Sequence, residues 1–116
     1  MNFGDYTKQL REQRHRISSR YSVRQMALRV GIKPGYLSRL ERGEVSPPPE
    51  ETILRLAADL GEDPDILLAL AGQIAADVRE IIVQRPLLFA ELIRGLSDLP
   101  DHQLTTLVQQ VRNSRY

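Results

Sequence analysis

The stretch from Ser22 to Gly43, SVRQMALRVGIKPGYLSRLERG, constrains the fold of this chain more than any other segment. Ser22, which opens the stretch, and Gln25, three residues later, form a capping box, a pattern that marks the start of a helix. Apolar residues then recur at helical spacing as far as Gly31, where a glycine ends the helix in a left-handed turn. Pro34 suits the first position of a second helix. The pattern therefore predicts two short amphipathic helices joined by a tight turn.

Each of these two helices carries one apolar face, which directs it toward a core. The residues that we expect to be buried are Met26, Ala27, Val30, Leu37 and Leu40, with Ile32 packing across the turn. Two short helices joined in this way form a helix-turn-helix, the motif whose second helix lies in the major groove of DNA.

A further helix is predicted before this stretch, from about Gly4 to His15. Its apolar contacts are expected to be Phe3, Tyr6, Leu10 and, beyond its end, Ile17. Residues 18–21 are interpreted as a connecting loop.

Two more helices are predicted after the rigid link Ser46-Pro47-Pro48-Pro49, which cannot lie inside a helix. The first of them begins with two glutamates, ends at Gly61 and has as its apolar residues Ile53, Leu54, Ala57 and Leu60. Asp63 and Pro64 form a cap and first-turn pair for the second, which reaches about Ala71.

The character of the chain changes after Gly72, where an acidic segment rich in aliphatic residues begins. Its apolar stripes follow helical spacing, and Pro86 and Pro100 divide it into three helical pieces. No strand pattern or internal repeat occurs. We therefore predict an all-α protein with two parts, a domain over residues 1–72 and a helical C-terminal extension over residues 73–116.

The charge is distributed unevenly along the chain. Residues 1–46 hold ten Lys and Arg against four Asp and Glu, a net charge of +6, whereas residues 47–116 hold six against eleven, a net charge of −5. Such a division indicates that the first part meets a polyanion. The alternative is chance clustering of solvated charges.

Several classes of protein are disfavoured by the composition. The chain has no cysteine, which excludes disulfides and thiolate metal sites. It has no apolar run long enough to cross a membrane and no signal peptide at its N-terminus, so a cytoplasmic protein is expected. His15 and His102 are too few and too far apart to indicate a metal or catalytic site. No nucleophile motif or glycine-rich phosphate loop occurs. We expect no enzyme activity, no metal and no cofactor.

Residues 4–71 resemble the lambda-repressor-like family of helix-turn-helix regulators of bacteria and phages, also called the Cro/repressor or xenobiotic-response-element type. The matching segments are LRE at 10–12, SVRQMALRVGI at 22–32, YLSRLERGE at 36–44 and ILRLAADLG at 53–61. The spacing Ala27–Gly31–Leu37–Glu41–Gly43 is the specific part. The resemblance implies a five-helix domain that binds operator DNA as a dimer and controls transcription. It also implies a structural ion pair between Arg11 and Glu41.

The sequence departs from the family in two places. The link between the first two helices is longer than in the shortest members and carries Arg16 and Arg20, which either contact phosphate or belong to a solvated loop. The third helix starts Lys33-Pro34-Gly35, where the family has a hydroxyl cap followed by base-reading side chains.

The expected DNA contacts follow from the placement of polar groups on the two helices. The recognition helix is expected to run from about Pro34 to Arg42. We predict base-reading roles for Lys33, Tyr36, Ser38 and Arg39, of which the arginine can bind guanine O6 and N7 through two hydrogen bonds. Phosphate contacts are predicted for Ser22, Val23, Arg24, Arg42 and Ser46. Each of three DNA contacts has an alternative without DNA: Arg39 is then an ordinary surface arginine, the Tyr36 ring packs partly against the first helix of the motif, and Ser46 is only a turn residue.

The apolar stripes of residues 73–116 must be buried against something. They favour dimerisation, and the competing interpretation is a docking site for another protein, such as the toxin partner of an antitoxin. For the whole chain we predict a dimeric regulator, expected to be a repressor, bound to a palindromic operator of double-stranded DNA. The alternative is an interaction module or antitoxin-like protein that keeps the scaffold without using DNA.

Overall fold

A computed structural model describes residues 1–115 of the chain. In this part all regular structure is helical, which confirms the all-α prediction. The structure divides into two compact units, Met1–Ala75 (the first unit) and the residues from Ala76 onward (the second unit). The first unit contains α1 (Phe3–His15), the 3-10 helix η1 (Ser19–Tyr21), α2 (Val23–Val30), α3 (Pro34–Glu41), α4 (Glu50–Leu60) and α5 (Pro64–Leu70). The second contains α6 (Ala76–Gln84), α7 (Pro86–Leu96) and α8 (Asp101–Asn113).

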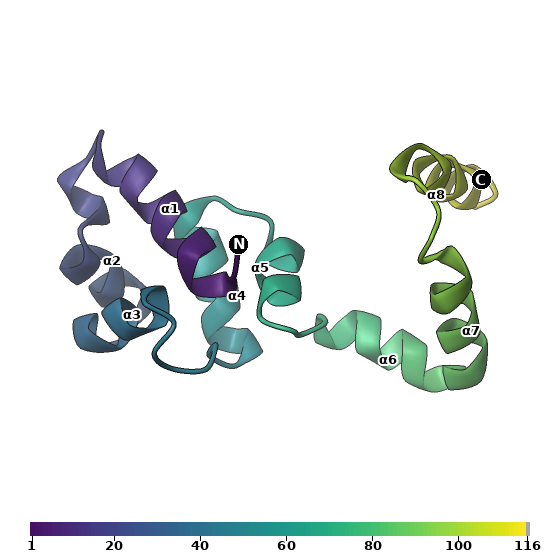
Figure 1. Ribbon diagram of the computed structural model, residues 1–116, viewed down its shortest axis with the longest axis horizontal. Coiled ribbons are helices and arrows are strands. Elements are labelled where there is room, and N and C mark those ends of the chain that lie inside the picture. The colour runs from purple at the N-terminus through teal and green to yellow at the C-terminus, as the bar shows by residue number, and fades with distance from the viewer. Residues whose placement is uncertain (116) are drawn as a thin grey trace. The chain divides into compact units, whose positions relative to one another are not determined.

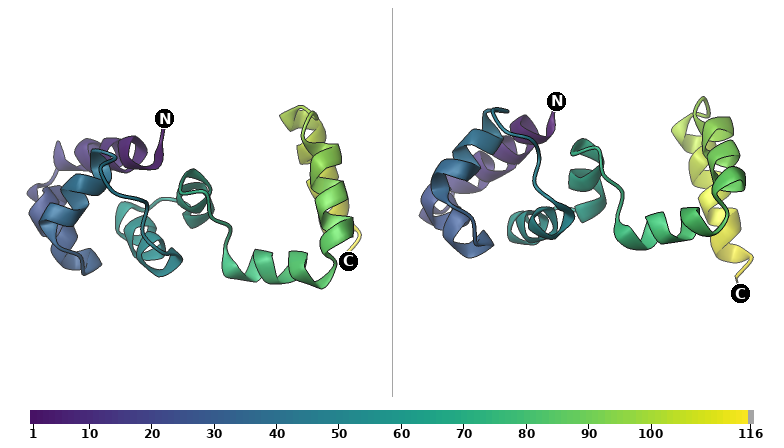
Figure 2. Two further views of the ribbon diagram at one scale, coloured as in Figure 1. Left: turned by 60° about the horizontal axis from the view of Figure 1, so that its bottom comes forward. Right: turned by 90° about the horizontal axis from the view of Figure 1, so that it is seen from below.

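The five α-helices of the first unit gather around one apolar core (Figure 1). The expected stripes of α2 and α3 are buried, and the core that they enter also contains residues of α1, α4 and α5. The fully enclosed side chains include Met26, Leu37, Ile53, Leu60 and Leu67. In both views of Figure 2, α2 and α3 lie together along one edge of this unit. This arrangement leaves the outer face of α3 in solvent.

Two predicted core positions are wrong. Ile17 is 89% exposed, because α1 ends at His15 and the chain turns away from the core before Ile17. Leu54 is 40% exposed, and Leu56 occupies the buried position instead. The buried face of α4 follows i, i+3, i+4, i+7 spacing from Ile53, and a residue adjacent to Ile53 points about 100° away from that face.

The close approach of α1 to α3 depends on a glycine. A Cβ atom added to Gly4 would lie 2.3 Å from the carbonyl oxygen of Leu40 and 3.0 Å from that of Glu41. Both neighbours are backbone atoms, so no side-chain rotation can make room. Gly4 therefore sets the distance between the first helix and the end of the third.

The connection between α1 and α2 is more ordered than the predicted loop. It contains the 3-10 turn η1, and Arg29 of α2 holds this turn in place. The guanidinium of Arg29 donates 2.7 and 3.1 Å hydrogen bonds to the Asp59 carboxylate and a 2.6 Å hydrogen bond to the carbonyl of Arg20. It also lies 4.9 Å from the centroid of the Tyr21 ring, whose hydroxyl donates to the carbonyl of Asp59. A cation–π contact and several charge-assisted hydrogen bonds thus fix the link against α2 and α4.

The second unit differs in its packing from the first. Among its described residues, 76–115, none is buried, although the helices begin and end near the predicted prolines. No helix within residues 1–115 is both long enough and apolar enough to cross a membrane.

Candidate nucleic-acid interface

The turn between α2 and α3 has the geometry expected of a helix-turn-helix. Gly31 adopts φ +83°, in the left-handed region that favours glycine. The amides of Gly31 and Ile32 both donate to the carbonyl of Ala27, at 2.9 and 3.0 Å. These bonds close the end of α2 and direct the chain into α3, which starts with Pro34 at its first turn. Gly31 therefore ends α2 and Pro34 starts α3, as the sequence predicts.

The start of α3 presents a cation to solvent without a cap. Lys33 occupies the N-cap position, makes no side-chain capping bond and is exposed. A positive charge at this end of a helix opposes the helix dipole, so an anion bound here would relieve the conflict. Added Cβ atoms at Gly35 would meet nothing within 4 Å, so the tip of the helix is open to a close approach.

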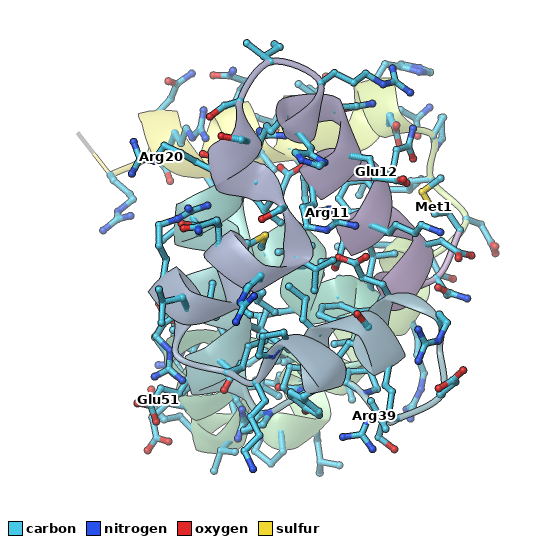
Figure 3. The ribbon with its side chains drawn as sticks, turned by 90° about the vertical axis from the view of Figure 1, so that its left-hand side faces the viewer. Met1, Arg11, Glu12, Arg20, Arg39 and Glu51 are labelled. Carbon is cyan, nitrogen blue, oxygen red and sulfur yellow. The ribbon has the colours of Figure 1, made fainter. Side chains whose placement is uncertain are left out.

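The remaining predicted base-reading residues follow on α3. Arg39 is exposed, and the only hydrogen bond that its side chain makes within the described residues is a 3.4 Å contact from Nε to the carbonyl of Gly35. Figure 3 shows its side chain pointing outward at the edge of the molecule. Tyr36 and Ser38 are half-buried, so each offers only part of its side chain to a ligand. Arg39 is therefore the most accessible hydrogen-bond donor along the helix.

The start of α2 offers unpaired backbone donors. The Ser22 hydroxyl accepts a 3.2 Å hydrogen bond from the amide of Gln25, which is one half of the predicted capping box. The other half is wrong, because the Ser22 amide donates to the carbonyl of Ser19 at 3.2 Å and not to the Gln25 side chain. Within the described residues the amides of Val23 and Arg24 have no partner, and the exposed Arg24 guanidinium has none either. Two free amides at a helix N-terminus, together with a guanidinium, suit a phosphate group.

Arg42, directly after α3, already forms an ion pair with an acidic residue. Arg42 donates to the Glu44 carboxylate through Nε at 2.8 Å and Nη2 at 3.2 Å, and both side chains are about half exposed. This hydrogen bond lowers the pKa of the Glu44 carboxyl, which stays ionised. Ser46 is exposed in the following link. A phosphate contact from Arg42 would therefore compete with Glu44, an acidic neighbour that the sequence prediction did not take into account.

The side chains of Arg11 and Glu41 form a buried, two-bond ion pair between α1 and α3. Nε lies 2.7 Å from Oε2 and Nη2 lies 2.9 Å from Oε1 of the carboxylate, and the two side chains are 7% and 4% exposed. Nη1 donates a third bond to the carbonyl of Tyr21. Figure 3 shows Arg11 enclosed among the helices, away from the outer face of α3. The pair positions α3 and does not present a charge to a ligand.

A shallow hollow of about 190 Å³ lies beside the turn of the motif. Sequence reasoning missed it, because its lining comes from both helices and from the turn between them. The lining residues are Arg24, Gln25, Leu28, Ile32 and Pro34. Leu28 is 75% exposed, which is unusual for a leucine on a helix whose other face is fully buried. Leu28 therefore adds an exposed apolar side chain to the solvent-facing side of α2, which is otherwise polar.

The described residues, 1–115, hold no group of three or more His, Cys, Asp or Glu side chains arranged to bind a metal ion. The Asp63 carboxylate accepts a 2.9 Å hydrogen bond from the amide of Asp65, which confirms the predicted helix cap.

Comparison with known proteins agrees with this geometry. The helix-turn-helix domain family matches residues 2–70, more than half of the chain. Among solved structures, a chain from a SinR protein/SinI protein complex has a TM-score of 0.51 at 20% sequence identity, with 97% of this chain and 98% of that chain covered. At this identity the likeness concerns the fold. No curated protein matches the sequence. The chain belongs to the helix-turn-helix domain family, and its α2–turn–α3 segment has the geometry of the motif after which the family is named.

Proposed function

We propose that this protein is a transcriptional regulator that binds a palindromic operator in double-stranded DNA as a dimer and represses the adjacent promoter. In this proposal the recognition helix, about Pro34 to Arg42, enters the major groove. A bound dimer that covers a promoter blocks transcription sterically, without a surface that contacts the transcription machinery. The observation that carries the proposal is a set of three exposed cations on the motif, none of which forms an ion pair within residues 1–115, namely Arg24, Lys33 and Arg39.

The roles of these residues differ by position. Lys33 and Arg39 lie at and along α3, where side chains reach base edges, and Tyr36 and Ser38 supply partly buried polar contacts beside them. Ser22, Val23 and Arg24 form the start of α2, which suits a phosphate. Arg42 and Ser46 extend the phosphate contacts past α3. Because Pro34 and Gly35 offer no polar side chain at the helix tip, DNA shape is expected to contribute part of the specificity.

A mobility-shift experiment with DNA sequences selected from a random pool tests the proposal directly. Neutralisation of about six phosphates per dimer predicts that log K falls with log salt concentration at a slope of roughly −5. Folded protein that binds no DNA sequence even at low salt overturns the proposed function.

Arg39→Ala and Arg24→Ala separate base reading from phosphate contact. Arg39→Ala should relax the preference at one base position per half-site, which corresponds to about 1–3 kcal/mol of lost discrimination against the wrong base. Arg24→Ala should weaken binding to all sequences alike and reduce the salt slope by about one per half-site. The measurement is repeated sequence selection, together with titrations at several salt concentrations. An equal loss of specificity in both variants would contradict this division of roles.

Glu44→Gln tests the role of Arg42. Removing the carboxylate releases Arg42 and deletes one negative charge beside the proposed phosphate path, so affinity should rise for every sequence by roughly fivefold per dimer. The matched control is Glu51→Gln, which breaks the exposed Arg55–Glu51 pair on α4 and should leave affinity unchanged. Fluorescence-anisotropy titrations measure both. An unchanged affinity for Glu44→Gln would remove Arg42 from the set of phosphate contacts.

A second candidate function is binding of another protein through residues 73–116, in place of DNA binding or in addition to it. The observation that favours it is the exposed apolar surface of α6, α7 and α8. The structural relative likewise comes from a complex of two different proteins. A chain that stays monomeric and binds no selected DNA would favour this candidate over the regulator.

A further inference from the structure

The second unit has too little enclosed surface to be stable by itself. Its described residues number about 40, and none of them is buried. Segments of this size ordinarily need disulfides, a metal or association with another chain to fold stably. The chain has no cysteine, and residues 1–115 contain no metal-binding cluster. Association is the remaining source of stability.

The apolar surface of this unit is concentrated where α7 and α8 meet. Figure 1 shows α7 lengthwise and α8 nearly end-on, so the two helices run in different directions. Between them lies a hollow of about 360 Å³, lined by Arg112 and by six aliphatic residues, Leu92, Leu96, Leu104, Leu107, Val108 and Val111. Leu107, Val108 and Val111 remain 39%, 49% and 62% exposed. The hollow is therefore an open apolar site within one unit.

The apolar stripe of α8 is symmetric about its own centre. Its members lie at positions 104, 107, 108 and 111, so the order of spacings is the same in both directions along the helix. When a second copy of α8 is laid antiparallel on the first, Leu104 comes opposite Val111 and Leu107 comes opposite Val108. Because the same pairs form twice, a two-fold axis passes between residues 107 and 108. This is the self-complementary arrangement that an isologous interface requires.

The charges at the two ends of the stripe complete this match. Asp101 lies three residues before Leu104, the first member of the stripe. Arg112 and Arg115 follow Val111, the last member. In the antiparallel arrangement, Asp101 of one copy comes opposite position 114 of the other, between the two arginines. None of these three side chains has an ion pair within residues 1–115. A parallel arrangement would instead bring Asp101 beside its own copy, which like-charge repulsion disfavours.

We propose that α8 binds α8 of a second copy of this chain in an antiparallel, two-fold symmetric interface, with Leu92 and Leu96 of each α7 flanking the contact. This inference deepens the proposed function, which requires a dimer, by assigning the surface that forms it. Residues 76–115 hold five acidic and five basic residues, so the two copies of this unit carry no net charge that would repel. The occupant of the hollow is thus the stripe of the partner.

The first test measures the mass of the full chain in solution without DNA, by sedimentation over a range of concentrations. The wild-type protein should be a dimer at micromolar concentration. Leu107→Asp places a charge on the two-fold axis in both copies, so the dissociation constant should rise about a hundredfold or more. The matched control is Leu87→Asp on α7, whose side chain is 85% exposed and lies outside the hollow; the dimer should persist.

Charge reversal tests the antiparallel register without changing an apolar side chain. Asp101→Arg alone should weaken the dimer about tenfold, since it meets Arg112 and Arg115 of the partner. The paired change Arg112→Asp with Arg115→Asp should weaken it similarly. Mixing the two variants should restore a dimer that holds one copy of each, which native mass spectrometry distinguishes from the homodimers. Circular dichroism of each variant checks that the helices remain.

The outcomes are separable from those of the DNA experiments. A wild-type monomer, a dimer that resists Leu107→Asp, or a mixture without preferred heterodimers overturns the α8 interface, whatever the protein does with DNA. Conversely, a dimer with the expected mutational behaviour that binds no DNA supports the interface and overturns the proposed function.

Discussion

Glu41→Ala should lower the free energy of unfolding of the first unit by about 3–5 kcal/mol, the cost of leaving one member of a buried ion pair alone. The partner guanidinium, Arg11, is 93% enclosed and keeps only its bond to the carbonyl of Tyr21. Because the charge cannot reach water without opening the contact between α1 and α3, the folded state carries the whole penalty. Domains of this size have about 5–15 kcal/mol of stability in total, so the loss is a large part of what holds the first unit folded.

Urea unfolding followed by tyrosine fluorescence measures this change, since three of the four tyrosines lie in the first unit. The matched control is Glu44→Ala, which removes the same group from an exposed pair and should change stability little. The double change Arg11→Met with Glu41→Leu should recover most of the loss, because it removes the isolated charge and fills the space. A small effect of Glu41→Ala, or a double variant no more stable than the single one, would contradict this interpretation of the pair.

Gly4→Ala should destabilise the first unit by about 3 kcal/mol, although alanine is the better helix former by about 1 kcal/mol. The added methyl group would lie 2.3 Å from the carbonyl oxygen of Leu40, well inside van der Waals contact. Relief requires moving α1 away from the end of α3, which also strains the adjoining pair of Arg11 and Glu41. The sign of the effect is therefore opposite to the one expected from helix propensity alone.

Gly35→Ala is the matched control, since an added Cβ there meets nothing within 4 Å and the residue also lies in a helix. It should leave stability unchanged or raise it slightly. Thermal and urea unfolding of the two variants, compared with the wild type, give the result. A Gly4→Ala protein as stable as Gly35→Ala would show that α1 has room to shift, and that Gly4 does not set its distance from α3.

The sequence predicted those features of the fold that arise from local spacing. The α2–turn–α3 segment was predictable because Gly31 and Pro34 mark its boundaries and the apolar stripes repeat within a few residues. The errors occur where the local pattern is ambiguous. At Leu54 two adjacent aliphatic residues compete for one face, and at Ile17 the helix had already ended.

Other features depend on contacts between residues far apart in the chain. Arg29 and Asp59 are 30 positions apart, and no spacing rule connects them before the helices are packed. The close approach at Gly4 likewise follows from the packing of α1 on α3 and not from its neighbours in the sequence. At the candidate interface, residue types predicted which side chains face outward, but the pairing of Arg42 with Glu44 follows from the turn that the chain makes at Gly43.

The side-chain amide of Gln73 donates a 2.9 Å hydrogen bond from Nε2 to the carbonyl of Pro48, and Ala71 and Ala75 pack against the core. The family match stops at residue 70, yet the first unit continues to Ala75. A shortened chain cut at the end of the family match would lose this bond and uncover apolar surface next to α5. For dissection of the protein, the natural place to cut is therefore after residue 75, and domain limits taken from sequence families alone would yield a fragment prone to aggregation.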